Sequence, residues 1–224
     1  LRAADAVVFA ASSLIDSDYE GQLQRAVGQY QASGGAVVTL SEHILSCPRV
    51  TFANKQAISD MVGHLVEKGH GRIAYLAGPA DLAVGRARLE AYRAALGEHG
   101  LVADPKLVEH GQFTIHGGMD AVANLLSRTE FTALLCANDL MAIGAIQEVL
   151  AQGHDVPGDI SIAGLDDIPI AEFGRVPLTT LRIPTYEMGR RGAALVLSLL
   201  AGEQPADVQL RGEIVERESV GTHP

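Results

Sequence analysis

The stretch that decides the fold runs from Ala133 to Thr180 and reads ALLCANDLMAIGAIQEVLAQGHDVPGDISIAGLDDIPIAEFGRVPLTT. It opens with a short apolar run that predicts a buried strand, and apolar residues then recur at helical spacing. Gly153 ends that helix, because glycine adopts a left-handed backbone without steric penalty. A second apolar run, Ile160 to Gly164, predicts another buried strand.

A polar pair follows each of these two strands. Asn138 and Asp139 follow the first strand, and Asp166 and Asp167 follow the second. In an open parallel sheet, ligands bind in the crevice outside the carboxyl ends of the strands. Both pairs are therefore predicted to face one ligand-binding crevice.

The rest of the chain alternates short apolar runs with amphipathic segments. Strands that alternate with helices predict an α/β fold, in which parallel sheets carry helices on both faces. The further strands are expected at 6–10, 36–40, 49–52, 73–77, 107–113, 178–183 and 211–219. The helices are expected at 16–33, 54–68, 84–99, 115–127, 138–152, 168–173 and 185–200.

The composition is that of a globular α/β protein. The 224 residues, 47% of them hydrophobic, can form one large domain or two lobes of about 110 residues each. The net charge of −10 makes the chain a poor candidate for binding nucleic acid through its own surface. Cys47 and Cys136 are the only cysteines, which disfavours a disulfide framework and fits a reducing cytoplasm.

Membrane insertion and export have no support in the sequence. No run approaches the roughly 18 apolar residues of a transmembrane helix. The first ten residues, LRAADAVVFA, lack the charged, apolar and small-residue layout of a signal peptide.

Several long motifs resemble the effector-binding core of the LacI/GalR family of bacterial transcription regulators. Their order and spacing make the resemblance specific, and it extends over nearly the whole chain. In chain order the motifs are GHGRIAYLAGP (69–79), RLEAYRAAL (88–96), ANDLMAIGA (137–145), VPGDISIAGLDD (156–167), PLTTLRIP (177–184) and EMGRRGAALVLSLLAGE (187–203).

The resemblance implies a two-lobed, periplasmic-binding-protein-like fold in which each lobe is a parallel sheet with helices on both faces. The chain would cross between the lobes three times. The first lobe would comprise 1–52 and 184–209, and the second lobe 53–183 and 210–224. The family's first strand-helix-strand-helix module and its DNA-binding head are missing before the strand 6–10, so we expect a truncated first lobe.

The function that the resemblance implies is that of a ligand-sensing and dimerisation domain. A sugar, nucleobase or related metabolite would bind between the lobes and control the binding of operator DNA, as in a repressor. The DNA would be bound through a head domain absent from this chain, and the protein would be a cytoplasmic homodimer with no cofactor and no metal.

The acidic pair Asp166-Asp167 could hold a metal, act as a catalytic acid pair or accept hydrogen bonds from a ligand. Adjacent residues of an extended segment point to opposite sides, so both side chains cannot easily serve one site. We therefore assign Asp166 to the ligand. Asp167 is expected to cap the short helix 168–173.

Three more side chains are candidates for the ligand site. Asn138 is a good helix N-cap, and the resemblance makes it a ligand contact as well. Arg88 lies in the first turns of a helix, where a cation opposes the helix dipole, and its planar fork suits a carboxylate, a phosphate or two hydroxyls. The resemblance places Arg88 and the aromatic Phe113 against the ligand, so Arg88→Ala is expected to abolish binding but leave the fold intact.

The helix 138–152 is apolar most of the way round, which predicts that it is buried on more than one side. One side would face its own sheet. The other would face a second copy of the chain, and the resemblance places Ile143 at the centre of that interface.

Other functions are weaker alternatives. Gly69 to Ala74 matches G-x-G-x-x-A, but the motif follows a helix and precedes a strand, the reverse of a dinucleotide site. Zinc-binding histidine pairs and a G-x-S-x-G nucleophile motif are absent, so an enzyme is not expected. A periplasmic-type sugar receptor shares the fold, but sugar cages usually carry several aromatic residues, and this chain has no tryptophan.

Overall fold

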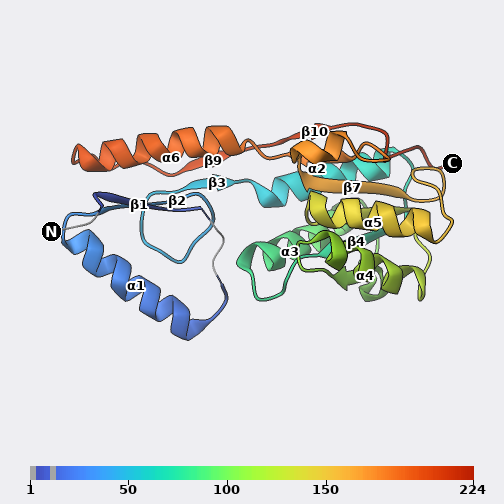
Figure 1. Cartoon of the computed structure of the whole chain (residues 1–224), viewed down its shortest axis with the longest axis horizontal. Helices are drawn as coiled ribbons and strands as arrows, with labels where there is room; N and C mark the ends of the chain where they lie inside the picture. The colour runs from blue at the N-terminus through green and yellow to red at the C-terminus, as the bar shows by residue number, and fades with distance from the viewer. Residues whose placement is uncertain (1–3, 11–13) are drawn as a thin grey trace. The chain divides into compact units, whose positions relative to one another are not determined.

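The computed structural model describes residues 4–10 and 14–224 (Figure 1). They group into two compact units. The first unit runs to Ala53 and also holds Asp81–Val84 and Pro184–Arg211; the second unit holds Asn54–Ala80, Gly85–Ile183 and Gly212–Pro224.

These bounds differ from the expected lobes by one residue at Ala53 and by two at Arg211. The grouping of Asp81–Val84 with the first unit was not predicted from the sequence. It follows from a bridge between Leu14 and Leu82 and from a hydrogen bond of 2.8 Å, which the Ile15 N–H donates to the Asp81 carbonyl.

The second unit is built on a six-stranded sheet of order β10-β8-β7-β6-β4-β5 (Figure 1). Strands β8, β7, β6, β4 and β5 are parallel, as expected, whereas β10 runs antiparallel to β8 and corrects that expectation at one edge. The strands are β4 (Ile73–Ala77), β5 (Val108–His110), β6 (Ala133–Cys136), β7 (Ser161–Asp166), β8 (Thr179–Arg182) and β10 (Glu213–Val215).

Helices flank this sheet. They are α2 (Asn54–Glu67), α3 (Ala83–Glu98), α4 (Ile115–Leu126) and α5 (Asp139–Ala151). Tyr92 of α3 stacks on Tyr75 of β4, with ring centroids 4.5 Å apart. Because parallel crossovers are right-handed, α3 lies on the face opposite to α4 and α5.

The helices α4 and α5 approach each other closely. A Cβ atom on Gly144 of α5 would lie 2.0 Å from the Ile115 carbonyl oxygen of α4, so only glycine fits there. The second side of α5 is therefore covered by α4 of the same chain. This corrects the expectation that a second copy is needed to cover it.

The first unit holds two pairs of parallel strands. The strands β1 (Ala6–Phe9) and β2 (Ala36–Thr39) form one pair, and β3 (Val50–Phe52) and β9 (Val208–Leu210) form the other. Helices α1 (Ser17–Ala32) and α6 (Thr185–Leu200) complete the unit, and α1 is capped by the Asp16 side chain, which accepts from two backbone N–H groups.

Two expected elements have a different form. The strand expected at 107–113 is a 3₁₀ turn, Pro105–Leu107, followed by the three-residue β5. The helix expected at 168–173 is a 3₁₀ helix, Pro169–Glu172, which is too short to form an α-helical turn of its own. No described helix is long and apolar enough to cross a membrane.

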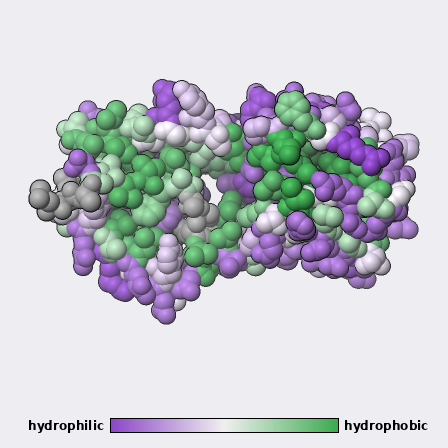
Figure 2. Space-filling model, viewed as in Figure 1, coloured by the Kyte–Doolittle hydropathy of each residue, from purple (hydrophilic) through white to green (hydrophobic). Residues whose placement is uncertain are grey.

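Strand β1 is paired on one side only among the described residues. Its partner is β2, and Val8 of β1 is 45% exposed. Figure 2 shows hydrophobic surface gathered over the first unit. An apolar strand with an open edge leaves N–H and C=O groups without ladder partners.

We therefore expect the amides of 6–10 to exchange with solvent roughly tenfold or more faster than those of 160–164, which lie in the fully buried centre of the second unit's sheet. Hydrogen exchange followed by mass spectrometry or NMR measures this directly. Equal protection of the two segments would mean that β1 is covered on both sides.

Candidate ligand site

The predicted site residues lie at one edge of the second unit's sheet. Phe113 follows β5, Asn138 follows β6, and Asp166 is the last residue of β7. Arg88 lies in α3, which follows β4. The carboxyl ends of parallel strands meet at this edge, and the structure brings these four residues to it.

Arg88 is buried, with 7% of its surface exposed, and its guanidinium is held from three sides. Its Nε donates to Asn54 Oδ1 at 2.8 Å, and its Nη1 donates to the Ala137 carbonyl at 2.6 Å. Its Nη2 lies 3.9 Å from Asp166 Oδ1. Arg88 therefore links α2 to the ends of β6 and β7. Because of these contacts, we expect Arg88→Ala to lower stability, in place of the sequence-based expectation that the fold stays intact.

Asp166 is held in an unusual backbone conformation, with φ of 130°. The pKa of its carboxyl is raised to about 7, chiefly by burial and also by the charge of Asp139, although the charge of Arg88 opposes the shift. At neutral pH this carboxyl changes its protonation state readily. It can then accept hydrogen bonds from two hydroxyls as a carboxylate, or donate one as an acid.

Asp167 points away from Asp166 and is bound to two arginines. Its Oδ2 accepts from Arg182 Nε at 2.6 Å and its Oδ1 from Arg217 Nη2 at 2.7 Å, which holds the pKa of this carboxyl below its usual value despite some burial. It does not cap the 3₁₀ helix, whose N-cap residue is Ile168 without a side-chain hydrogen bond. The local role expected for Asp167 is thus an ion pair and not a cap.

Asn138 uses both ends of its amide. Its Oδ1 accepts from the Met141 N–H at 3.0 Å, which confirms the predicted N-cap of α5. Its Nδ2 donates to the Phe113 carbonyl at 3.3 Å. Asn138 therefore fixes the neighbouring site residue Phe113, and one hydrogen of its Nδ2 is left for other partners.

Phe113 has a left-handed backbone, with φ of 55°, which is rare for a bulky residue. Its ring lies so close to Gly78 that a Cβ atom there would be 2.1 Å from the ring. Among the described residues the three non-glycine positions with positive φ are Phe113, Asp166 and Asp167, all at this edge. Such strained backbone costs about 1–3 kcal/mol per residue, persists only where the surrounding structure holds it, and often clusters at functional sites.

Asp139 was not predicted to have a role separate from Asn138. It is fully buried and does not reach the edge. Its Oδ2 accepts from the Ile168 N–H at 2.9 Å and its Oδ1 from Thr180 Oγ1 at 2.5 Å. The sequence indicates only that Asp139 lies in the first turn of a helix. It does not indicate that the carboxyl group is buried.

Comparisons with known proteins decide the family. The model of the family described as periplasmic binding protein-like domain matches residues 62–220. The repressor CytR of Escherichia coli K12 is 39% identical over 160 residues, which are 71% of this chain and 47% of that protein. The regulator GalR of the same strain is 38% identical over 162 residues, again 71% of this chain and 47% of that protein.

A solved structure of the transcriptional regulator CelR in complex with cellobiose has a TM-score of 0.86 and 32% identity, and the match covers 97% of this chain and 66% of that chain. The chain belongs to the LacI/GalR family. The part in hand is its periplasmic-binding-protein-like, effector-binding domain. It spans about half the length of the curated relatives it matches, and those cited are named as regulators and not as enzymes.

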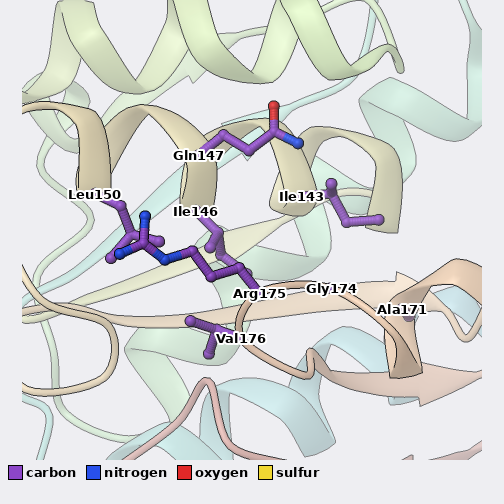
Figure 3. Close-up of a pocket in the computed structure, with 8 residues that line it drawn as sticks. All are labelled: Ile143, Ile146, Gln147, Leu150, Ala171, Gly174, Arg175 and Val176. Atoms are coloured by element: carbon purple, nitrogen blue, oxygen red, sulfur yellow. The ribbon is translucent and has the colours of Figure 1, made fainter.

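A second feature of this LacI/GalR domain lies away from the edge. Ile143 is partly buried at a shallow pocket of about 180 Å³ on the outer side of α5 (Figure 3). Arg175 lies across this pocket with its guanidinium toward Leu150. The pocket is mainly apolar, and its lining residues are Ile143, Ile146, Gln147, Leu150, Ala171, Gly174, Arg175 and Val176.

Metal ligation finds no support in the described part of this LacI/GalR domain. No group of three or more His, Cys, Asp or Glu side chains there could hold a metal ion. The edge residues are instead hydrogen-bonding groups and one aromatic ring, a set that suits an organic ligand with hydroxyl groups.

Proposed function

We propose that this chain is the effector-sensing domain of a LacI-type transcription regulator, acting as a repressor, and that a sugar or related neutral metabolite binds at the carboxyl edge of the second unit's sheet. The observation that carries the proposal is the convergence of Arg88, Asn138 and Asp166 at that edge, beside the strained Phe113. The cellobiose bound by the similar regulator CelR supports a sugar as the class of ligand.

The chemistry of the edge favours a neutral, hydroxyl-bearing ligand over an anion. Two of the donor groups of Arg88 are taken by Asn54 and Ala137, and Asp166 partly compensates its charge. Asp166 itself would repel an anionic ligand. Its carboxylate accepts hydroxyl donors, and the half-buried ring of Phe113 offers an apolar face to a sugar ring or a base.

The regulator acts by coupling two binding events. An effector that binds one state of the protein more tightly than the other shifts the equilibrium between the states. The affinity of a DNA-binding head for operator DNA then changes by the same coupling free energy. In this proposal DNA is a partner through that head, in the cytoplasm. The net charge of −10 makes the chain itself a poor candidate for binding DNA.

The regulator is a homodimer through the outer side of α5. Ile143 and its apolar neighbours form the pocket there, and Phe173 beside it is 77% exposed. An exposed aromatic next to an apolar pocket is the composition of an interface core. A two-fold interface would use the same patch on both copies.

A thermal-shift screen tests the effector class. Neutral sugars and nucleosides should include a ligand that raises the midpoint of unfolding, whereas sugar phosphates should not. At 100 times Kd a ligand adds about 2.7 kcal/mol of stability, which corresponds to a rise of roughly 5–10 °C in a domain of this size. If only anionic compounds stabilise the protein, the neutral-ligand proposal is wrong.

A further inference from the structure

The three residues after β6 touch every other part of the candidate site. The Ala137 carbonyl accepts from Arg88, which follows β4, and the Asn138 amide donates to Phe113, which follows β5. The Asp139 carboxylate accepts a hydrogen bond from Ile168, in the turn that follows β7. The end of the central strand thus connects the site residues that come from its neighbours.

Asp139 makes the contacts of a structural anchor. It is 0% exposed, so it does not touch a ligand at the edge. Its carboxylate accepts from the backbone N–H groups of Asp167 and Ile168 and from the hydroxyl of Thr180 on β8. Two of these three donors belong to the turn that begins at Asp166.

That turn needs to be held. Asp166 and Asp167 both have positive φ, at 130° and 59°, a conformation that persists only where the surroundings over-determine it. Arg182 and Arg217 bind the Asp167 carboxylate, whose side chain is 7% exposed. Asp139 binds the backbone of the same turn from the buried side.

We propose that Asp139 is a positioning residue of the ligand site, and that its carboxylate holds the strained turn that presents Asp166 to a hydroxyl-bearing ligand. This inference rests on the proposed function of the edge. The positioning of the turn can be tested without any ligand, so this proposal and the proposed ligand class can be tested separately.

The charges around Asp166 support this role. Burial is the largest cause of the raised pKa of Asp166. Arg88 from α3 faces Asp166 and lowers this pKa, whereas the charge of Asp139 from α5 raises it. The charge of Asp167 is compensated by its two arginines. Replacing Asp139 with a neutral residue removes one of the causes that raise the pKa of Asp166, so this pKa should fall.

The test compares Asp139→Asn with the wild type in the absence of effector. Titration of the Asp166 side-chain carbon by NMR should give a midpoint near 7 in the wild type and a lower midpoint in the variant. The Ile168 amide should exchange roughly tenfold faster in the variant, because its acceptor is weakened. Asp120→Asn removes the same charge from an exposed site on α4 and should change neither value.

A second pair of variants covers the case in which Asp139→Asn does not fold. Thr180→Val removes one of the donors that orient the carboxylate, and Thr180→Ser keeps it. The Ile168 amide should exchange faster in Thr180→Val than in Thr180→Ser. For the sugar or nucleoside found by thermal shift, affinity should fall roughly tenfold in Thr180→Val and return in Thr180→Ser.

The outcomes separate the two proposals. Unchanged Ile168 exchange in a folded Asp139→Asn protein, or equal Ile168 exchange in the two Thr180 variants, would overturn the positioning role. If the NMR changes occur as expected but no neutral sugar or nucleoside binds, the positioning role stands and the proposed effector class is wrong.

Discussion

Arg88→Ala is expected to abolish effector binding and to destabilise the second unit by about 2–3 kcal/mol. The variant loses the hydrogen bonds to Asn54 and to the Ala137 carbonyl, and it leaves the Asp166 carboxyl without its cationic neighbour. Breaking a buried charge pair costs about 3–5 kcal/mol. We expect a cost at or below the lower end of this range, because Asp166, with a pKa already raised to about 7, can become neutral instead of remaining an unpaired charge.

The losses of stability and of effector binding are measured by two experiments on the same protein preparation. Thermal unfolding should show a midpoint lower by roughly 5–10 °C. Isothermal titration with the stabilising sugar or nucleoside should show no binding. Arg86→Ala is the matched control, since this arginine lies two residues earlier on α3 and is exposed.

Arg88→Lys separates charge from shape. Lysine keeps the cation but lacks the planar fork that reaches Asn54 and Ala137 together. We expect this variant to recover part of the lost stability and little of the binding. Wild-type affinity in Arg88→Ala would remove the arginine from the site, and wild-type stability would show that its hydrogen bonds contribute nothing to the fold.

The sequence predicted the second unit well for a physical reason. Its helices are long enough to show a clear period, and its strands are buried on both faces and read as apolar runs. β4 of this unit agrees with the predicted bounds to the residue, as does α6 of the first unit. The three-residue strand β9 was missed because so short a segment carries no period, and its pairing with β3 depends on residues far away in the chain.

The site could be predicted only in part. The location of the site at this edge of the sheet could be predicted, because ligands bind where parallel strands end. The strained backbones of Phe113 and Asp166 were not, because no local pattern shows that a residue other than glycine will adopt positive φ. The buried position of Asp139 depends likewise on Thr180 and Ile168, which its neighbours in sequence do not reveal.

Ile143→Glu is expected to convert the homodimer into monomers, with a dissociation constant raised roughly 100-fold or more. The sheet and α4 cover two sides of α5 within the chain, so the proposed dimer would use the remaining side, which carries the pocket lined by Ile143. Ile143 is partly buried in that stripe, where Ala171 and Val176 line the same pocket (Figure 3). A carboxylate there would lose its hydration on association, and Arg175, the cation that lines the same pocket, has its guanidinium toward Leu150 and not toward Ile143.

Size-exclusion chromatography with light scattering measures the change over a range of protein concentrations. Gln152→Glu adds the same charge to an exposed position at the end of α5 and should leave the dimer intact. Phe173→Ser removes the exposed aromatic beside the pocket without adding charge, and it should weaken the dimer without abolishing it. If Ile143→Glu and Phe173→Ser both keep the wild-type mass at every concentration, the regulator pairs through another surface, and the pocket on α5 has a different occupant.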